Sequence, residues 1–122
     1  PGLTRVFYSD SGATAVEVAL KMAFQYWRQC PTPQPNKTRY LSLNAAYHGD
    51  TLGAVAVGDL ARFHHLFAPL LFPVHHAASP HCYRCPLGLR RESCGLACAD
   101  ELVALIRRHA DELAAVILEP GM

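Results

Sequence analysis

The run AAVIL, from Ala114 to Leu118, decides the fold class of this 122-residue chain. Every residue in it is apolar, and the charged Glu119 follows at once. A strand that is apolar along its whole length fits a sheet covered on both faces, which is how parallel strands lie in α/β proteins. The sequence therefore predicts an α/β fold with a mostly parallel sheet and flanking helices.

Other periodic segments supply the remaining elements of that fold. Apolar residues at helical spacing predict a helix of about four turns from Thr14 onwards, with Glu17 on its polar side. The same spacing predicts a second helix across residues 102–109. Residues 38–43 alternate as a strand does. The small apolar residues 51–57 predict a short helix that packs closely against another element.

Residues 60–98 are rich in histidine, proline and cysteine, and we expect a long excursion with little regular structure. Within it, Cys82-x2-Cys85 and Cys94-x3-Cys98 place four thiols in a spacing that can hold zinc tetrahedrally. The eight-residue gap between the pairs is short for a zinc ribbon, so free surface or packing thiols are the other interpretation. A small cysteine-rich zinc-binding or interaction module is thus an alternative function.

Composition limits the classes of partner. Eleven basic and ten acidic residues give a formal charge of +1, which leaves no basic excess to bind a phosphate backbone. No apolar run approaches the roughly 20 residues that cross a bilayer, and no signal-peptide pattern opens the chain. We expect neither nucleic acid nor a membrane as partner, and a cytoplasmic protein. Pro1 and Met122 resemble cut ends, so we expect a piece of a longer chain.

The first candidate site is a turn at a helix start. Residues 6–8 are β-branched or aromatic and predict a short strand, which runs into Ser11, Gly12, Ala13 and Thr14. The first N–H groups of a helix are unpaired and the helix dipole is positive there, so a phosphate can bind at such a turn. A well-capped helix without a ligand is the other interpretation.

Two further candidates lie where predicted strands end, and ligands of α/β sheets bind at the carboxyl ends of strands. Tyr47, His48 and Asp50 follow the strand 38–43, where a tyrosine can stack on a flat ring and a histidine can move protons. The alternative is a plain loop that caps the next helix. Glu119 ends the AAVIL strand, and a carboxylate next to a buried strand needs a partner.

Three blocks, in order along the chain, resemble the class III aminotransferases. They are FYSDSGATAVEVALKMA at residues 7–23, YHGDTLGA at residues 47–54 and ILEP at residues 117–120. The resemblance implies pyridoxal 5'-phosphate as cofactor and a fold-type I transferase large domain. Residues 1–122 would then be part of that domain, truncated at both ends, with residues 60–98 as an excursion within it. A homodimer is also implied.

Two details are similar to one branch of that family. They are Asp50-Thr51 after His48-Gly49, and the ending Gln25-Tyr26-Trp27 of the first helix. The branch transfers an amino group from S-adenosyl-L-methionine to 8-amino-7-oxononanoate, giving 7,8-diaminononanoate in biotin biosynthesis. Another class III enzyme, acting on ω-amino acids or diamines, is the alternative within the family.

The resemblance assigns roles to residues of all three blocks. It implies that the main-chain N–H groups of Gly12 and Ala13 bind the cofactor phosphate. It implies that Tyr47 lies against the pyridine ring and borders the substrate, and that Glu119 stands near the ring hydroxyl. Supporting roles fall to Ser11, Thr14, His48 and Asp50. Ala13 replaces the serine usual in the family, and the neighbouring threonine hydroxyl is the candidate substitute.

The family's catalytic lysine has no counterpart in this sequence. The resemblance implies a lysine that forms a Schiff base with the cofactor and moves the proton. Neither Lys21, in the first helix, nor Lys37, in a proline-rich loop, matches it. We therefore expect that lysine beyond residue 122. Residues 121–122 follow Glu119-Pro120 directly, where the family has a longer glutamine- and glycine-containing stretch, which indicates a truncation or a deletion.

Overall fold

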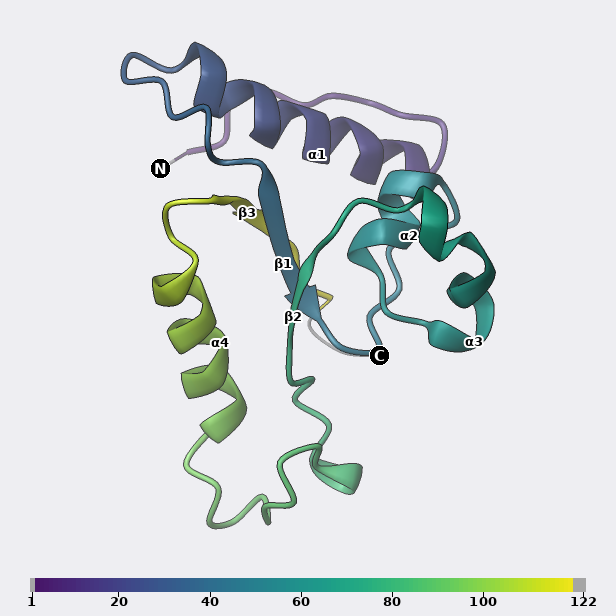
Figure 1. Cartoon of the computed structure of the whole chain (residues 1–122), viewed down its shortest axis with the longest axis vertical. Helices are drawn as coiled ribbons and strands as arrows, with labels where there is room; N and C mark the ends of the chain where they lie inside the picture. Colours follow the sequence, from purple (N-terminus) through teal and green to yellow (C-terminus); the bar gives the residue numbers. More distant parts are fainter. Residues whose placement is uncertain (1, 120–122) are drawn as a thin grey trace.

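The structure is a computed structural model, and it describes residues 2–119. The predicted break after Glu119-Pro120 lies outside this range. Three parallel strands form one sheet in the order β2-β1-β3 (Figure 1). Their bounds are β1 Arg39–Leu43, β2 His75–Ala77 and β3 Leu113–Val116. The predicted α/β fold with a parallel sheet is confirmed.

Helices cover both faces of the sheet, α1 and α2 on one side and α4 on the other (Figure 1). Their bounds are α1 Gly12–Gln29, α2 Leu52–Val57 and α4 Ala97–Arg108. Successive residues of a strand point to opposite faces. Tyr40 accordingly packs with Leu20 of α1, while the fully buried Leu41 packs in the cluster that α4 covers. Both faces of β1 are therefore buried, as its apolar residues require.

The strand predicted at residues 6–8 is wrong. Residues 2–9 have no regular structure, and Phe7 and Tyr8 are exposed. A strand is stable only when a neighbour pairs with it, and no described strand lies beside this segment. The β-branched and aromatic composition of these residues is therefore not sufficient to make a strand.

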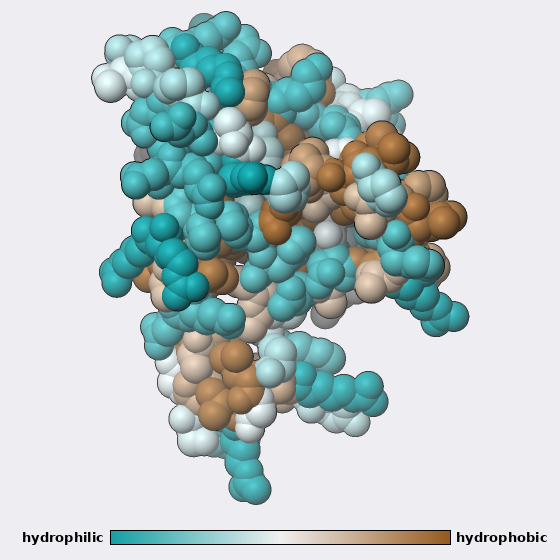
Figure 2. Space-filling view, viewed as in Figure 1, coloured by the Kyte–Doolittle hydropathy of each residue, from teal (hydrophilic) through white to brown (hydrophobic). Residues whose placement is uncertain are grey.

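The excursion at residues 60–98 holds more structure than its composition indicates. It contains α3 (Ala61–His64), the 3₁₀ helix η1 (His65–Leu70), β2 and the 3₁₀ helix η2 (Cys82–Arg84). Strand β2 pairs with β1 and forms one edge of the sheet. Apolar side chains remain exposed over α3 and η1, where Figure 2 shows a hydrophobic area. Of the helices described, none has the length and apolar character needed to cross a bilayer.

Candidate functional site

The start of α1 presents two free backbone donors. Ser11 is the N-cap, and its hydroxyl accepts a hydrogen bond from the N–H of Thr14 at 3.3 Å. Within residues 2–119, the N–H groups of Gly12 and Ala13 donate to no partner. A Cβ placed on Gly12 would meet nothing within 4 Å. Gly12 is exposed and both donors lack a partner among the described residues, so this turn can accept an anion.

The hydroxyl of Thr14 is engaged in the cap itself. It donates to the Asp10 carboxylate at 2.8 Å and accepts from the Ser11 N–H at 3.2 Å. The hydrogen bond from Thr14 is the main cause of a lowered pKa at Asp10. The threonine thus holds the turn in shape in this structure, and its hydroxyl would have to leave Asp10 to reach a phosphate.

Tyr47, on the loop that follows β1, keeps part of its ring exposed while its hydroxyl is fixed. The hydroxyl donates to Asp50 at 2.7 Å, and the side chain is 42% exposed. That hydrogen bond is the first cause of a raised pKa of Tyr47. Asp50 holds the hydroxyl end of the Tyr47 ring, and the exposed part of that ring is available for stacking.

Glu119 connects the end of β3 to the loop after β1. Its carboxylate accepts a hydrogen bond from the backbone N–H of Tyr47 at 3.0 Å. His48 is half-buried beside it, and burial lowers the pKa of this imidazole while the charge of Glu119 partly opposes that shift. Among the described residues, His48 Nε2 has no hydrogen-bond partner. The second and third predicted sites therefore form one site.

Gly49 joins this loop to the start of α1. Its φ is +122°, and a Cβ built there would lie 2.6 Å from the Cβ of Ala13. Glycine is the residue that tolerates both this backbone conformation and this close approach. The contact places Tyr47 and Glu119 on the same side of the molecule as the free donors of α1, so the structure brings all three predicted blocks together.

Glu17 is a residue of this region that sequence reasoning missed. Its carboxylate accepts hydrogen bonds from the N–H groups of Gly53 at 2.6 Å and Ala54 at 3.3 Å, both in the first turn of α2. A carboxylate is favourable at a helix N-terminus. Its place on the polar side of α1 gave no signal, because the partner lies 36 residues away.

The profile of the family described as aminotransferase class-III matches residues 1–122. The chain belongs to the class III aminotransferases. It is 56% identical over 119 residues to a protein of Nitratidesulfovibrio vulgaris and 53% identical over 121 residues to one of Geobacter sulfurreducens. Both relatives are named adenosylmethionine-8-amino-7-oxononanoate aminotransferase, and each match covers 98% of the chain. The chain spans 22% and 26% of the lengths of these relatives.

Solved structures of aminotransferases share the fold. The adenosylmethionine-8-amino-7-oxononanoate aminotransferase of Methanocaldococcus jannaschii superposes with a TM-score of 0.78 at 42% identity, covering 95% of this chain and 23% of that one. An amine transaminase from an uncultivated Pseudomonas species, in a form with pyridoxal phosphate bound, gives 0.81 at 38% identity, covering 92% and 25%. The predicted fold type and family are therefore confirmed.

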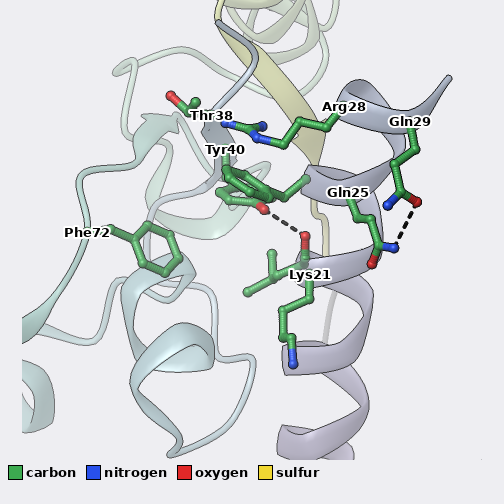
Figure 3. A pocket seen from close by; sticks show the side chains of 9 residues that line it. Lys21, Gln25, Arg28, Gln29, Thr38, Tyr40 and Phe72 are labelled. Carbon is green, nitrogen blue, oxygen red and sulfur yellow. Dashed lines mark hydrogen bonds between the residues drawn. The ribbon is translucent and has the colours of Figure 1, made fainter. Parts of the chain in front are cut away.

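Neither lysine of this class III chain lies at the site. Lys37 donates to the carbonyls of Ala110 and Leu113 and lies 4.4 Å from the centre of the Trp27 ring, at the amino end of β3. Lys21 lines a groove along α1. Figure 3 shows this groove, about 610 Å³ in volume, between α1, Tyr40 and Phe72. This groove is separate from the candidate site, because none of the predicted site residues line it.

A smaller hollow of about 260 Å³ opens beside Glu119. It lies at the carboxyl ends of the strands, where Leu43, Asn44, Ser79 and His81 also line it. This is the edge at which parallel sheets hold ligands.

The four cysteines of the excursion line one small hollow, and all are free thiols. In residues 2–119, no three of the sulfur atoms of Cys82, Cys85, Cys94 and Cys98 lie within 4.8 Å of one another. The four cysteines therefore lie near one another, but their sulfur atoms are not arranged to bind one metal ion.

Proposed function

We propose that this chain forms the phosphate-side and ring-side half of the cofactor site of an aminotransferase that uses S-adenosyl-L-methionine to aminate 8-amino-7-oxononanoate. The observation that carries the proposal is the contact of Gly49 with Ala13, which unites the free donors of α1 with the loop of Tyr47. In the proposed site, pyridoxal 5'-phosphate supplies an electron-withdrawing ring when it is bound.

The start of α1 fits the cofactor phosphate. The N–H groups of Gly12 and Ala13 lie at the positive end of α1 and have no partner among the described residues, so they can bind an anion. Ser11 and Thr14 support this turn through the cap. The alanine at position 13 offers no hydroxyl, so in our proposal the backbone carries the phosphate contacts.

The loop after β1 fits the ring of the cofactor. We propose that the exposed side chain of Tyr47 stacks on the pyridine ring of the cofactor and borders the substrate. Asp50 holds the tyrosine hydroxyl, and Glu119 holds its backbone N–H. Burial lowers the pKa of His48, which favours the neutral imidazole. We assign Glu119 a second role beside the ring hydroxyl, since only its Oε2 accepts a hydrogen bond from the described residues.

The substrate assignment rests on the relatives. Two relatives above 50% identity are named adenosylmethionine-8-amino-7-oxononanoate aminotransferase. An ω-aminotransferase of Paracoccus denitrificans matches in structure at 29% identity. The higher identity favours 8-amino-7-oxononanoate over an ω-amino acid or a diamine. We also propose a homodimer, because apolar side chains of α3 and η1 remain exposed on one face. A cytoplasmic location stays a prediction from the composition.

A chimaeric enzyme tests the substrate assignment. Residues 1–119 of this chain would replace the matching stretch of the Geobacter sulfurreducens enzyme, and formation of 7,8-diaminononanoate would be measured with S-adenosyl-L-methionine as donor. We expect an active chimaera, and the control is the unmodified enzyme. A chimaera that retains the cofactor and uses only ω-amino acids or diamines would overturn the substrate assignment. A folded chimaera that fails to retain the cofactor would overturn the assignment of the site.

A further inference from the structure

One side chain from β2 and two from the turn between α4 and β3 meet at one point that the proposed cofactor site does not use. His75 begins β2, His109 follows the last turn of α4, and Glu112 precedes β3. The carboxylate oxygen Oε1 of Glu112 lies 2.9 Å from Nε2 of His75 and 2.6 Å from Nδ1 of His109. All three ligand atoms lie within 4.8 Å of one another. Among residues 2–119, no other group of histidine, cysteine or carboxylate side chains meets this condition.

The three side chains are partly shielded from water and ordered against each other. Their exposed fractions are 29% for His75, 24% for His109 and 39% for Glu112. The imidazole rings of His75 and His109 stack, with centres 3.8 Å apart and planes at 25°. The two rings therefore present their nitrogens to the same carboxylate oxygen from one side.

The backbone fixes this arrangement. The N–H groups of Thr38 and Arg39 both donate to the carbonyl of Glu112 at 2.9 Å, which ties it to the start of β1. The N–H groups of Glu112 and Leu113 donate to the carbonyl of His109 at 3.0 Å. The turn between α4 and β3 is thus held by four hydrogen bonds, and two of the three side chains extend from it.

The donor set suits a divalent transition-metal ion. Two imidazoles and one glutamate are a known zinc ligand set, with a water in the fourth position. Imidazole also binds cobalt and nickel well. Metal–ligand bonds of about 2.0–2.2 Å place ligand atoms of a tetrahedral site roughly 3.3 Å apart. The present separations of 2.9 and 2.6 Å from Glu112 are about 0.4 and 0.7 Å shorter than this tetrahedral spacing, so the side chains would have to rotate apart to admit the ion.

We propose that His75, His109 and Glu112 bind one divalent transition-metal ion, and that zinc is the ion they bind in the cell. The site lies at the amino ends of β2 and β3, whereas Tyr47 and Glu119 lie past the carboxyl ends of β1 and β3. An ion there would fasten β2, α4 and β3 to one another. Its role is structural, and it takes no part in amino transfer.

Cobalt titration of the purified protein tests the site and separates it from the cysteines. Cobalt bound to imidazole and carboxylate gives visible bands without the near-ultraviolet band of a thiolate ligand. We expect one equivalent to bind with visible bands alone, zinc to displace it, and saturating zinc to raise the unfolding temperature. Because loss of an outer-shell partner alone costs about 10–100-fold in metal affinity, His75→Ala, His109→Ala and Glu112→Gln should each weaken binding by at least about 10-fold.

His81→Ala is the matched control, since His81 is exposed and lies outside the triad. It should leave cobalt affinity unchanged. A variant with all five cysteines replaced by serine should bind as the parent does, and circular dichroism would verify the fold of each variant. A spectrum dominated by the thiolate band, binding that survives His75→Ala and His109→Ala together, or the absence of stoichiometric binding in the folded parent would overturn the proposal.

Discussion

Gly49 lies directly on Ala13, so closely that a Cβ on the glycine would stand 2.6 Å from the Cβ of the alanine. The contact joins the loop after β1 to the first turn of α1. It also accounts for a small residue at position 13, because the side chain there points at the glycine.

Gly49→Ala should destabilise the protein by about 2–4 kcal/mol, the combined cost of backbone strain and overpacking. Gly88→Ala is the matched control, because Gly88 has φ +68° and nothing within 4 Å of its Cβ position. Strain alone predicts about 1 kcal/mol there. Urea unfolding measures both changes. Equal losses at the two positions would mean that the contact with Ala13 contributes nothing.

Glu17→Ala should cost about 1 kcal/mol, because two N–H groups in the first turn of α2 lose their acceptor. Glu17→Gln keeps an acceptor oxygen and should lose less. The free energy of unfolding of the two variants gives the comparison. A loss in the glutamine variant as large as in the alanine variant would show that the charge, rather than the hydrogen bond, caps α2.

His48 should make stability fall as the pH drops below about 6.5. Burial lowers the pKa of His48 from its ordinary value of 6.5 in the folded protein. The unfolded chain therefore takes up a proton first, and stability is lost between pH 6.5 and the lower folded pKa. His48→Gln should flatten this part of the stability curve, with His81→Gln as a surface control. An unchanged slope in His48→Gln would contradict the assigned burial effect.

The 122-residue chain should show no amino transfer by itself, because neither Lys21 nor Lys37 lies at the site. The assay supplies pyridoxal phosphate, S-adenosyl-L-methionine and 8-amino-7-oxononanoate, and seeks the diamine product. The chimaeric enzyme described above is the positive control. Product formation by the chain alone, or an absorbance band of cofactor linked to a lysine, would contradict the expectation.

The sequence predicted those elements whose periodicity is strong. Helix α1 follows from apolar residues at helical spacing, and β3 from a continuous apolar run. Strand β2 could not be predicted, because its three residues include two histidines and it exists through pairing with β1. Residues 6–8 show the reverse case, since their composition favours a strand and no described strand pairs with them.

The candidate site was predicted as separate pieces. Turn chemistry located Gly12, and the rule that ligands bind at the carboxyl ends of strands located Tyr47 and Glu119. The hydrogen bond between Tyr47 and Glu119 spans 72 residues, so only the fold shows it. Glu17 and the triad around Glu112 were missed for the same reason, because their partners are distant in sequence and their residue types are common on surfaces.

The first turn of α1 should bind the cofactor phosphate, and amide chemical shifts test this binding most directly. Pyridoxal phosphate would be titrated into the ¹⁵N-labelled protein, with pyridoxal as the control that lacks the phosphate. We predict that the amides of Gly12 and Ala13 shift with pyridoxal phosphate and not with pyridoxal. If both amides stay unchanged at saturating pyridoxal phosphate, or respond equally to pyridoxal, the account of this site is wrong.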